Sequence, residues 1–485
     1  MRLRDTVGGA LAANAGALFL SRVFTSALNF VVLLLLVARF SPAVVGAYYF
    51  LTNLLNILGV LIDFGSNTIA AREIARGRPE EEVLGDHLGL RTLLCLTGLL
   101  LFTGTILVTE SDPSRRLLFL LAAPSLPGFL LGSASVLFQV RHRMVWSAAA
   151  AMVGETVFAL IAIPMALSSA EESLRFRGLI AGTALADLVG GGLVFYWASK
   201  RVRLRPRFVL ARLWALFREA APQGLAAGAA VLYLYLDTVL LKRLRGDHDA
   251  GVYNAAYRLF NFFIAPAGMI AAAAFPLLVR ALFADPNRAR TLYGAVLQVQ
   301  LAVSLGPALI LAALAPEMVA AVYGRDRPEY AAAAESLRSL MVAGACVYPA
   351  ALASTVLTGL GQQRVWTWVT AAGLAVNVLA NLALIPRWGG PGAAWATLAT
   401  EGTVLLLAAV AARRLTPAAR APLAPLFRSL AAAFLGTGVA VAARSAGFWP
   451  ALAAGLAGYA LALATLSAWP REVFRLRSEL TAPPP

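Results

Sequence analysis

The sequence has little charge for its length. Only 14% of its 485 residues are charged and 60% are hydrophobic, whereas soluble globular chains carry about 25% charged and about 45–50% apolar residues. The mean hydropathy is +0.74. Water cannot solvate a folded surface of this composition, which excludes a secreted domain, a cytosolic enzyme and a disordered protein. We therefore expect the chain to be embedded in lipid.

Cysteine and histidine are scarce, which argues against metal or redox chemistry. The two cysteines, Cys95 and Cys346, lie inside apolar runs, where a free thiol is a small core residue. The three histidines do not cluster with them, and no zinc or haem spacing is present. We predict no metal site and no bound cofactor. The chain also has no Walker A motif, so direct use of ATP is not expected.

Long apolar runs dominate the chain. A membrane-spanning helix needs about 20 mostly apolar residues, because the hydrocarbon core is about 30 Å thick. Fourteen runs have this character: residues 7–38, 40–62, 92–109, 117–140, 144–170, 178–199, 220–241, 259–279, 291–316, 339–363, 365–386, 388–412, 429–443 and 445–470. The expected fold class is an all-α polytopic membrane protein with about fourteen transmembrane helices.

The excess of basic residues indicates how the chain crosses the membrane. The net charge is +16, and the basic residues lie in short segments between the apolar runs. This pattern is typical of membrane topology and not of a nucleic-acid-binding face, so no nucleic-acid partner is expected. With the N-terminus in the cytoplasm, the inner segments, to which we assign Arg91, hold more than twice as many Arg and Lys residues as the outer ones. Both termini are predicted to be cytoplasmic.

Matching patterns indicate an internal repeat. Residues 46–56 (GAYYFLTNLLN) and 251–261 (GVYNAAYRLFN) share Gly, Tyr and Asn at one spacing. The other matches are residues 178 and 187 with 392 and 401, and Trp146 and Pro164 with Trp366 and Pro386. These patterns predict two six-helix lobes related by a parallel pseudo-two-fold repeat, with two extra C-terminal helices.

The predicted organisation has five parts. They are an N-lobe (1–199), a cytoplasmic basic linker (200–219), a C-lobe (220–413), spans thirteen and fourteen (414–470) and a cytoplasmic tail (471–485). The second half of the linker sequence KRVRLRPRFVLARLWALFRE is amphipathic. We expect this segment to lie on the inner leaflet and to contact anionic lipids. A plain basic connector is the alternative.

Three groups of motifs carry a resemblance to a known family. They are GAY (46–48) with LLNILGVLIDFG (54–65) and Arg72, DTVLL (237–241) with AGVYNAAYRLF (250–260) and Phe275-Pro276, and NLALIPRWGGPGAAWAT (381–397). The chain resembles bacterial polysaccharide and oligosaccharide (O-antigen-type) flippases. These form the polysaccharide transport branch of the multidrug/oligosaccharidyl-lipid/polysaccharide exporter superfamily. The similarity covers nearly the whole chain.

The resemblance implies a function and its setting. It implies a multi-pass flippase of the bacterial or archaeal cytoplasmic membrane that carries undecaprenyl-pyrophosphate-linked oligosaccharide to the periplasmic leaflet by alternating access. An H⁺ or Na⁺ gradient or the membrane potential would drive it, and polysaccharide polymerase or assembly proteins would be its partners. A lipid II flippase and a drug/cation antiporter are alternatives. A membrane glycosyltransferase or polymerase is a remote one, because the first outer loop (39–46) is short. We predict that the chain is not an enzyme.

Polar residues inside the spans are the candidate substrate site, because a charge at a span centre costs about 2.5–3.5 kcal/mol on insertion scales. Arg22 in the first span and Arg258 in the eighth are expected to grip the lipid pyrophosphate, since guanidinium groups suit phosphate oxygens. Lipid II flippases similarly carry cavity arginines in these spans. The expected cavity also includes Asn29, Asn53, Asn56, Asn254, Asn261, Asn377 and Asn381. Snorkelling or ion pairing of the arginines and helix–helix hydrogen bonding of the asparagines are the alternatives.

Four acidic residues also lie inside predicted spans. They are Glu155, Asp187, Asp237 and Glu401. A carboxylate in a low-dielectric site suits proton exchange or Na⁺ binding, which makes these residues candidates for ion coupling. Structural ion pairs with the intramembrane arginines are the alternative.

Overall fold

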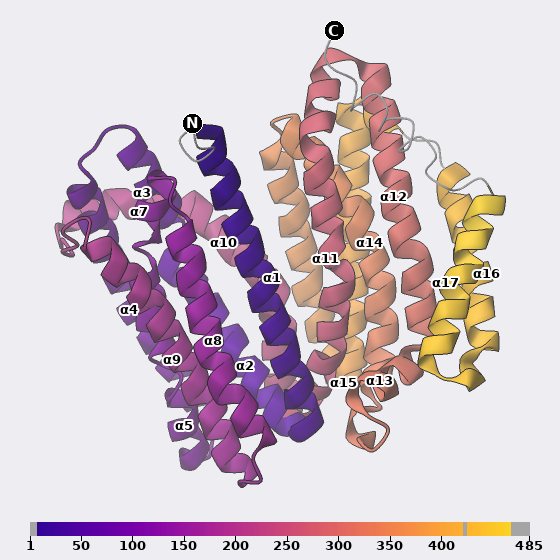
Figure 1. The fold of residues 1–485 in the computed structure, drawn as a ribbon, viewed down its shortest axis with the longest axis horizontal. Helices are drawn as coiled ribbons and strands as arrows, with labels where there is room; N and C mark the ends of the chain where they lie inside the picture. Colours follow the sequence, from indigo (N-terminus) through magenta and orange to yellow (C-terminus); the bar gives the residue numbers. More distant parts are fainter. Residues whose placement is uncertain (1–6, 421–423, 467–485) are drawn as a thin grey trace. The chain divides into compact units, whose positions relative to one another are not determined.

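The chain folds into α-helices that form two compact units. The computed structural model describes residues 7–420 and 424–466, and these contain helices and no strand. The units are Met1–Val239 and Leu240–Pro485, and we describe each by itself. The predicted tail, residues 471–485, lies outside the described residues. The all-α class is confirmed (Figure 1).

The first unit holds the N-terminal helices. They are α1 (Val7–Arg39), α2 (Pro42–Asp63), α3 (Ser66–Ala75), α4 (Glu80–Thr109), α5 (Pro113–Leu120), α6 (Ser125–Gly132), α7 (Ser135–Val140), α8 (Val145–Leu167), α9 (Glu172–Ser199) and most of α10 (Leu210–Arg245). The predicted fourth span is therefore made of three short helices, α5 to α7. The helical half of the predicted linker is the beginning of α10.

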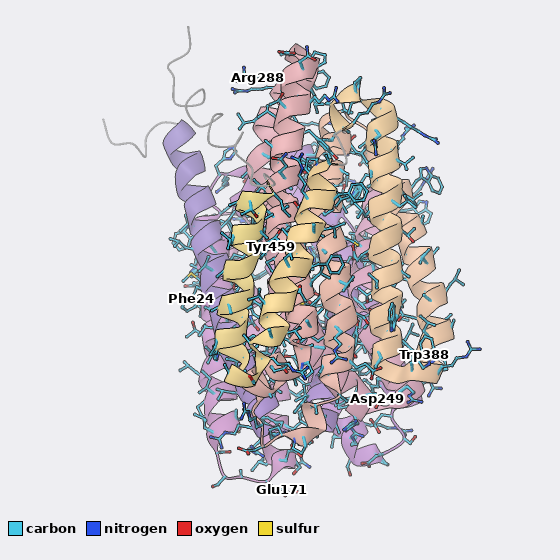
Figure 2. All side chains as sticks on the ribbon, turned by 90° about the vertical axis from the view of Figure 1, so that its right-hand side faces the viewer. Phe24, Glu171, Asp249, Arg288, Trp388 and Tyr459 are labelled. Atoms are coloured by element: carbon cyan, nitrogen blue, oxygen red, sulfur yellow. The ribbon has the colours of Figure 1, made fainter. Side chains whose placement is uncertain are left out.

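The second unit holds the remaining helices. They are α11 (Asp247–Ala284), α12 (Pro286–Ala313), α13 (Ala315–Tyr323), α14 (Ala333–Gly359), α15 (Gln363–Leu415), α16 (Ala424–Ala442) and α17 (Phe448–Thr465). Helix α14 packs against α11, α12 and α15, while α16 and α17 pack against each other and against α12. The Tyr459 hydroxyl of α17 donates to the Ala302 carbonyl of α12 at 3.0 Å. Figure 2 shows Arg288 at one end of this unit and Trp388 and Asp249 at the other.

The number of membrane crossings agrees with the sequence. Thirteen helical segments in the described residues are long and apolar enough to span a bilayer. One of them, α15, has 53 residues, about twice the length that a bilayer needs. It is interrupted at Gly389, so it supplies the predicted eleventh and twelfth spans. Counting α15 as two spans gives the predicted fourteen.

Gly389 makes the interruption in α15 because its backbone adopts a conformation open only to glycine. Its φ is 56° and its ψ is −129°, and side chains with a Cβ avoid this region. A Cβ here would also lie 2.7 Å from Oδ2 of Asp249. That carboxylate is held 3.1 Å from Nε of Arg245. The break in α15 therefore lies at Gly389, next to the ion pair between Arg245 and Asp249.

A second interruption separates α2 from α3 in the first unit. Phe64 and Gly65 have positive φ values of 41° and 74°. The Phe64 ring stacks on Phe217 of α10 with centroids 4.8 Å apart, and Phe217 stacks in turn on Trp214. The start of α10 is therefore held against the α2–α3 break.

Ion pairs hold the linker to the first turns of α4. The backbone N–H of Arg207 donates to the Gly85 carbonyl at 2.9 Å. The Arg207 guanidinium lies 3.5 Å from Glu82, and that of Arg212 lies 3.9 Å from Asp86. Acids at a helix N-terminus also interact favourably with the helix dipole. Part of the positive charge of the linker is therefore neutralised within the protein.

We predict that Gly389→Ala destabilises the second unit, whereas Gly402→Ala does not. Forcing a Cβ into the backbone conformation of Gly389 costs about 1–3 kcal/mol. Gly402 lies in the same helix, and a Cβ added there would meet no atom within 4 Å, while alanine favours a helix. Thermal unfolding of both variants in one detergent tests this. Equal midpoints for the two variants would contradict it.

Candidate functional site

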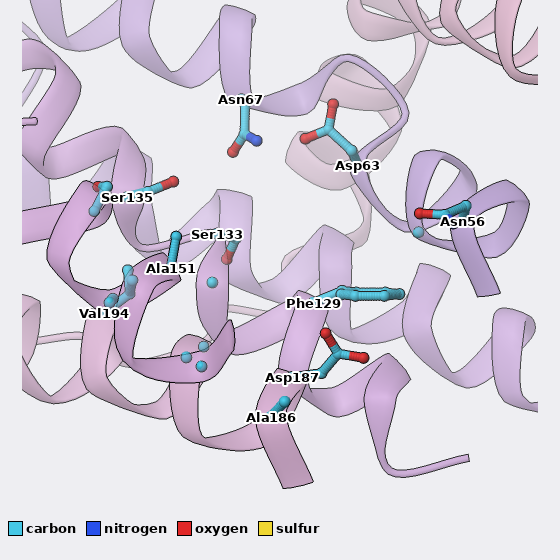
Figure 3. Close-up of a pocket in the computed structure, with 18 of the residues that line it drawn as sticks. Asn56, Asp63, Asn67, Phe129, Ser133, Ser135, Ala151, Ala186, Asp187 and Val194 are labelled. Atoms are coloured by element: carbon cyan, nitrogen blue, oxygen red, sulfur yellow. The ribbon is translucent and has the colours of Figure 1, made fainter. Parts of the chain in front are cut away.

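A polar cavity lies inside the first unit. Its volume is about 580 Å³, and α2, α3, α4, α6, α7, α8 and α9 contribute to its wall. Most of the lining residues are Gly, Ala or Ser, so backbones approach closely and leave open space. Its charged and amide residues are Asn56, Asp63, Asn67, Arg91, Glu155 and Asp187. In Figure 3 the Phe129 ring lies between Asp63 and Asp187.

Close packing of α6 on α9 builds the floor of the cavity. A Cβ on Gly191 would lie 2.0 Å from the Gly128 carbonyl oxygen, and one on Gly128 would lie 2.6 Å from the backbone of Asp187. Only glycine allows this contact, because any side chain would push the helices apart. The contact fixes Asp187 at the cavity wall.

Arg91 is the cationic group of this cavity, and it is held by the end of α2 and the start of α3. Its Nη1 lies 3.0 Å from Oδ1 of Asp63 and 3.0 Å from Oδ1 of Asn67. The Arg91 side chain is 4% exposed and that of Asp63 is 31% exposed. A guanidinium buried to this degree needs such partners to offset its desolvation. The pair therefore also ties α4 to the α2–α3 break.

Arg91 lies inside helix α4 and not in a segment before it, and its assignment to the inner side of the membrane stays a prediction. The apolar run starts at residue 92, but α4 begins at Glu80. The first turn of α4 is acidic, and the α2–α3 break supplies a carboxylate for Arg91, so the helix extends further than its apolar run. Sequence reasoning also missed Asn67 as a partner of Arg91. The available signal is that Asp63 and Asn67 continue the helical face that carries Asn53 and Asn56.

Glu155 and Asp187 are carboxylates of the cavity that have no cationic partner. Within the described residues, neither forms an ion pair with an Arg, Lys or His side chain. Oε1 of Glu155 is buried without a hydrogen-bond donor. The two groups lie close enough for electrostatic interaction, and the Asn29 side chain lies beside Glu155. A pair of unneutralised carboxylates is a suitable environment for a cation.

The structure brings together some of the site residues predicted in the first unit. Asn56, Glu155 and Asp187 line the same cavity, and Asn29 reaches it through Glu155. Asn53 is buried in α2 and is not among the lining residues, and Asp237 is buried in α10. Arg22 is exposed on α1 and is not among the lining residues. Its role as a headgroup ligand stays a prediction.

The second unit places its predicted residues on α11 and α15. Asn377 and Asn381 are buried, and Nδ2 of Asn381 donates to Oδ1 of Asn377 at 3.0 Å. The hydroxyl oxygens of Tyr253 and Thr397 lie 3.5 Å apart and join the two helices. Polar side chains therefore contact one another within α15 and between α11 and α15.

The remaining predicted residues of the second unit differ in exposure. Asn254 is buried, and its amide donates to the Ala250 carbonyl of its own helix at 2.7 Å. Arg258 and Asn261 are half-buried on α11, and Glu401 is half-buried on α15. Their part in binding a substrate or an ion stays a prediction.

Comparison with known proteins shows which families and solved structures this chain resembles. The polysaccharide biosynthesis protein family matches residues 11–282, and the MatE family matches residues 222–382. No curated protein sequence matches the chain. Among solved structures, the lipid II flippase MurJ in its inward closed conformation is similar with a TM-score of 0.73 and 12% identity, covering 94% of this chain and 98% of that one.

Two further solved structures share the fold. An inward-facing multidrug resistance MATE family transporter gives a TM-score of 0.63 at 14% identity, over 81% of this chain and 95% of that one. A transporter of the same superfamily from Pyrococcus furiosus gives a TM-score of 0.52 at 14% identity, and the match covers 85% of this chain and 97% of that one.

The fold and the polar cavity define a multi-pass membrane transporter of the multidrug/oligosaccharidyl-lipid/polysaccharide exporter superfamily. Because the family match covers more than half of the sequence, the chain belongs to the polysaccharide biosynthesis protein family.

We predict that Asp63→Ala destabilises the first unit by about 2–4 kcal/mol, because it leaves the buried Arg91 guanidinium without its carboxylate. Adding Arg91→Met should recover part of this loss, since the second substitution removes the uncompensated charge. Unfolding of both variants in one detergent measures the difference. A double variant no more stable than Asp63→Ala would contradict the assignment.

Proposed function

We propose that this transporter is a flippase for undecaprenyl-pyrophosphate-linked oligosaccharide. It moves this lipid from the cytoplasmic to the periplasmic leaflet of the cytoplasmic membrane, with both termini in the cytoplasm. The observation that carries the proposal is the match of residues 11–282 to the polysaccharide biosynthesis protein family. A polar cavity within an otherwise apolar bundle supports it, because a charged glycolipid headgroup cannot cross hydrocarbon without polar partners.

Arginine is the residue type suited to the anionic part of this substrate. A pyrophosphate carries several acceptor oxygens, and guanidinium groups donate to two of them at once. We assign this role to Arg22 and Arg258. Arg22 is exposed on α1 and Arg258 is half-buried on α11, so neither side chain is fully enclosed by protein. The polyprenyl tail would remain in lipid while the halves of the protein alternate in access.

The carboxylates of the first-unit cavity provide a separate site for coupling. Glu155 and Asp187 have no cationic partner in the described residues, so proton or Na⁺ binding would relieve their mutual repulsion. Binding of a cation inside this unit would then favour one arrangement of its helices. We propose that an H⁺ or Na⁺ gradient drives net transport through this pair.

The same observation favours a second candidate function. A cavity lined by two unpaired carboxylates and the Phe129 ring also suits an organic cation. Export of cationic drugs is therefore the alternative, and lipid II is the alternative lipid substrate. Both can be supplied in the assay used for the main proposal.

The linker surface supports contact with the membrane. Phe208, Leu210 and Trp214 are exposed there, beside the exposed arginines Arg203, Arg205 and Arg218. Apolar side chains next to arginines suit the boundary of an anionic leaflet. We propose that anionic lipids contact this segment.

We predict that Arg22→Gln and Arg258→Gln each slow transport by about 10–100-fold. A charge-assisted hydrogen bond to a charged group contributes about 1.5–3 kcal/mol, and about 1.4 kcal/mol corresponds to a factor of ten. The assay follows loss of protection of a fluorescent lipid-linked oligosaccharide in proteoliposomes. Arg280→Gln, an exposed arginine at the far end of α11, is the control. Wild-type rates in both test variants would overturn the headgroup assignment.

We predict that Glu155→Gln and Asp187→Asn abolish the stimulation of transport by an imposed ion gradient. The neutral side chains keep the shape of the cavity but cannot bind a cation. Glu171→Gln, an exposed acid just before α9, should respond to the gradient as wild type does. Persistent stimulation in both cavity variants would remove these carboxylates from the coupling mechanism.

A further inference from the structure

A second cavity lies at one end of the second unit. Its volume is about 570 Å³, and it is lined by α13, the segment after it, and the turn between α16 and α17. Figure 1 shows α13 and this turn at the same end of the unit. Figure 2 shows Trp388 and Asp249 at that end and Arg288 at the opposite one. In the predicted topology this end faces the outside.

The cavity contains two cationic groups and one anionic group. Arg325 and Arg444 line it and are exposed. Glu317, in the first turn of α13, lines it as well. Its Oε2 atom is buried and has no hydrogen-bond partner. Within the described residues these three side chains form no ion pair with one another.

A buried carboxylate oxygen that accepts no hydrogen bond lowers the stability of the folded protein. Oε2 of Glu317 is therefore a suitable acceptor for a donor group on a ligand. Neither Arg325 nor Arg444 donates to it, although both lie in the same wall. A ligand with an anionic group for the arginines and a cationic N–H donor for Glu317 would satisfy all three groups at once. This charge pattern selects a zwitterion over a simple anion.

The position of the cavity indicates that this zwitterion belongs to a lipid. The cavity adjoins the first turn of α17, and both α16 and α17 are long and apolar enough to span a bilayer. Trp449 lines the cavity and is 67% exposed, and exposed tryptophans concentrate at the level of the headgroups. The Gly447 N-cap gives α17 no side-chain cap, so its first N–H groups are also open to an acceptor.

We propose that this cavity binds the headgroup of an amine-bearing zwitterionic phospholipid, phosphatidylethanolamine, in the outer leaflet. The phosphate lies against Arg325 and Arg444, and the ammonium donates to Oε2 of Glu317. A choline headgroup has no N–H donor for Glu317. A phosphoglycerol headgroup brings no cation to it. The site is separate from the proposed substrate site and does not depend on which lipid is transported.

The test measures lipid binding to the purified full chain by mass spectrometry of the intact complex. The probes are phosphatidylethanolamine, phosphatidylcholine and phosphatidylglycerol with identical acyl chains. Wild type should prefer phosphatidylethanolamine to phosphatidylcholine by about tenfold, the effect of one charge-assisted hydrogen bond. Glu317→Gln should lose most of this preference, since its neutral amide forms no ion pair with an ammonium ion. The double variant Arg325→Gln/Arg444→Gln should weaken binding of all three lipids.

Arg288→Gln, at the opposite end of the unit, should bind the lipids as wild type does, and thermal unfolding of each variant checks its fold. Equal binding of the ethanolamine and choline lipids by wild type would overturn the proposal. A preference that survives Glu317→Gln would also overturn it. So would tighter binding of phosphatidylglycerol than of phosphatidylethanolamine, or occupation of the cavity by a second copy of the chain.

Discussion

Satisfying polar groups inside an apolar bundle is the constraint on which this structure depends. Each backbone amide that faces lipid must be hydrogen-bonded within the protein, so the described spans are built from helices. A charged side chain then needs a partner supplied by another helix. Arg91 of α4 is buried because Asp63 and Asn67 accept its hydrogen bonds, and this requirement places the α2–α3 break next to α4.

The same constraint explains where the cavity forms. Glycines allow α6 and α9 to touch through their backbones, which leaves a space lined by small residues above the contact. Polar side chains from several helices face this space because lipid cannot solvate them. Arg91 is neutralised by a partner, while Glu155 and Asp187 are not. The cavity therefore holds a structural ion pair and, beside it, two carboxylates without a cationic partner, and the proposed ion coupling depends on this second pair.

The fold could be predicted further than the site, because apolar length alone identifies spans. The fourteen runs and the all-α class follow from the requirement for about 20 apolar residues, and the break in α15 falls between two runs that were predicted as separate helices. The division of the fourth span into α5, α6 and α7 has no such signal. For the site, the apolar runs that contain Asn56, Glu155 and Asp187 identified them as intramembrane polar residues. The runs could not show that these residues share one cavity, since that depends on tertiary packing, and an apolar window excluded Arg91 by beginning one residue after it.

Direct observation of lipid-linked oligosaccharide transport tests the central claim most sharply. The purified chain is reconstituted into vesicles that hold the fluorescent undecaprenyl-pyrophosphate-linked oligosaccharide, lipid II or an organic cation in parallel, with protein-free vesicles as the reference. The account predicts that the protein exposes the linked oligosaccharide to an external quencher much faster than protein-free vesicles do, and faster than it exposes lipid II. Transport of the organic cation with no movement of either lipid would contradict it.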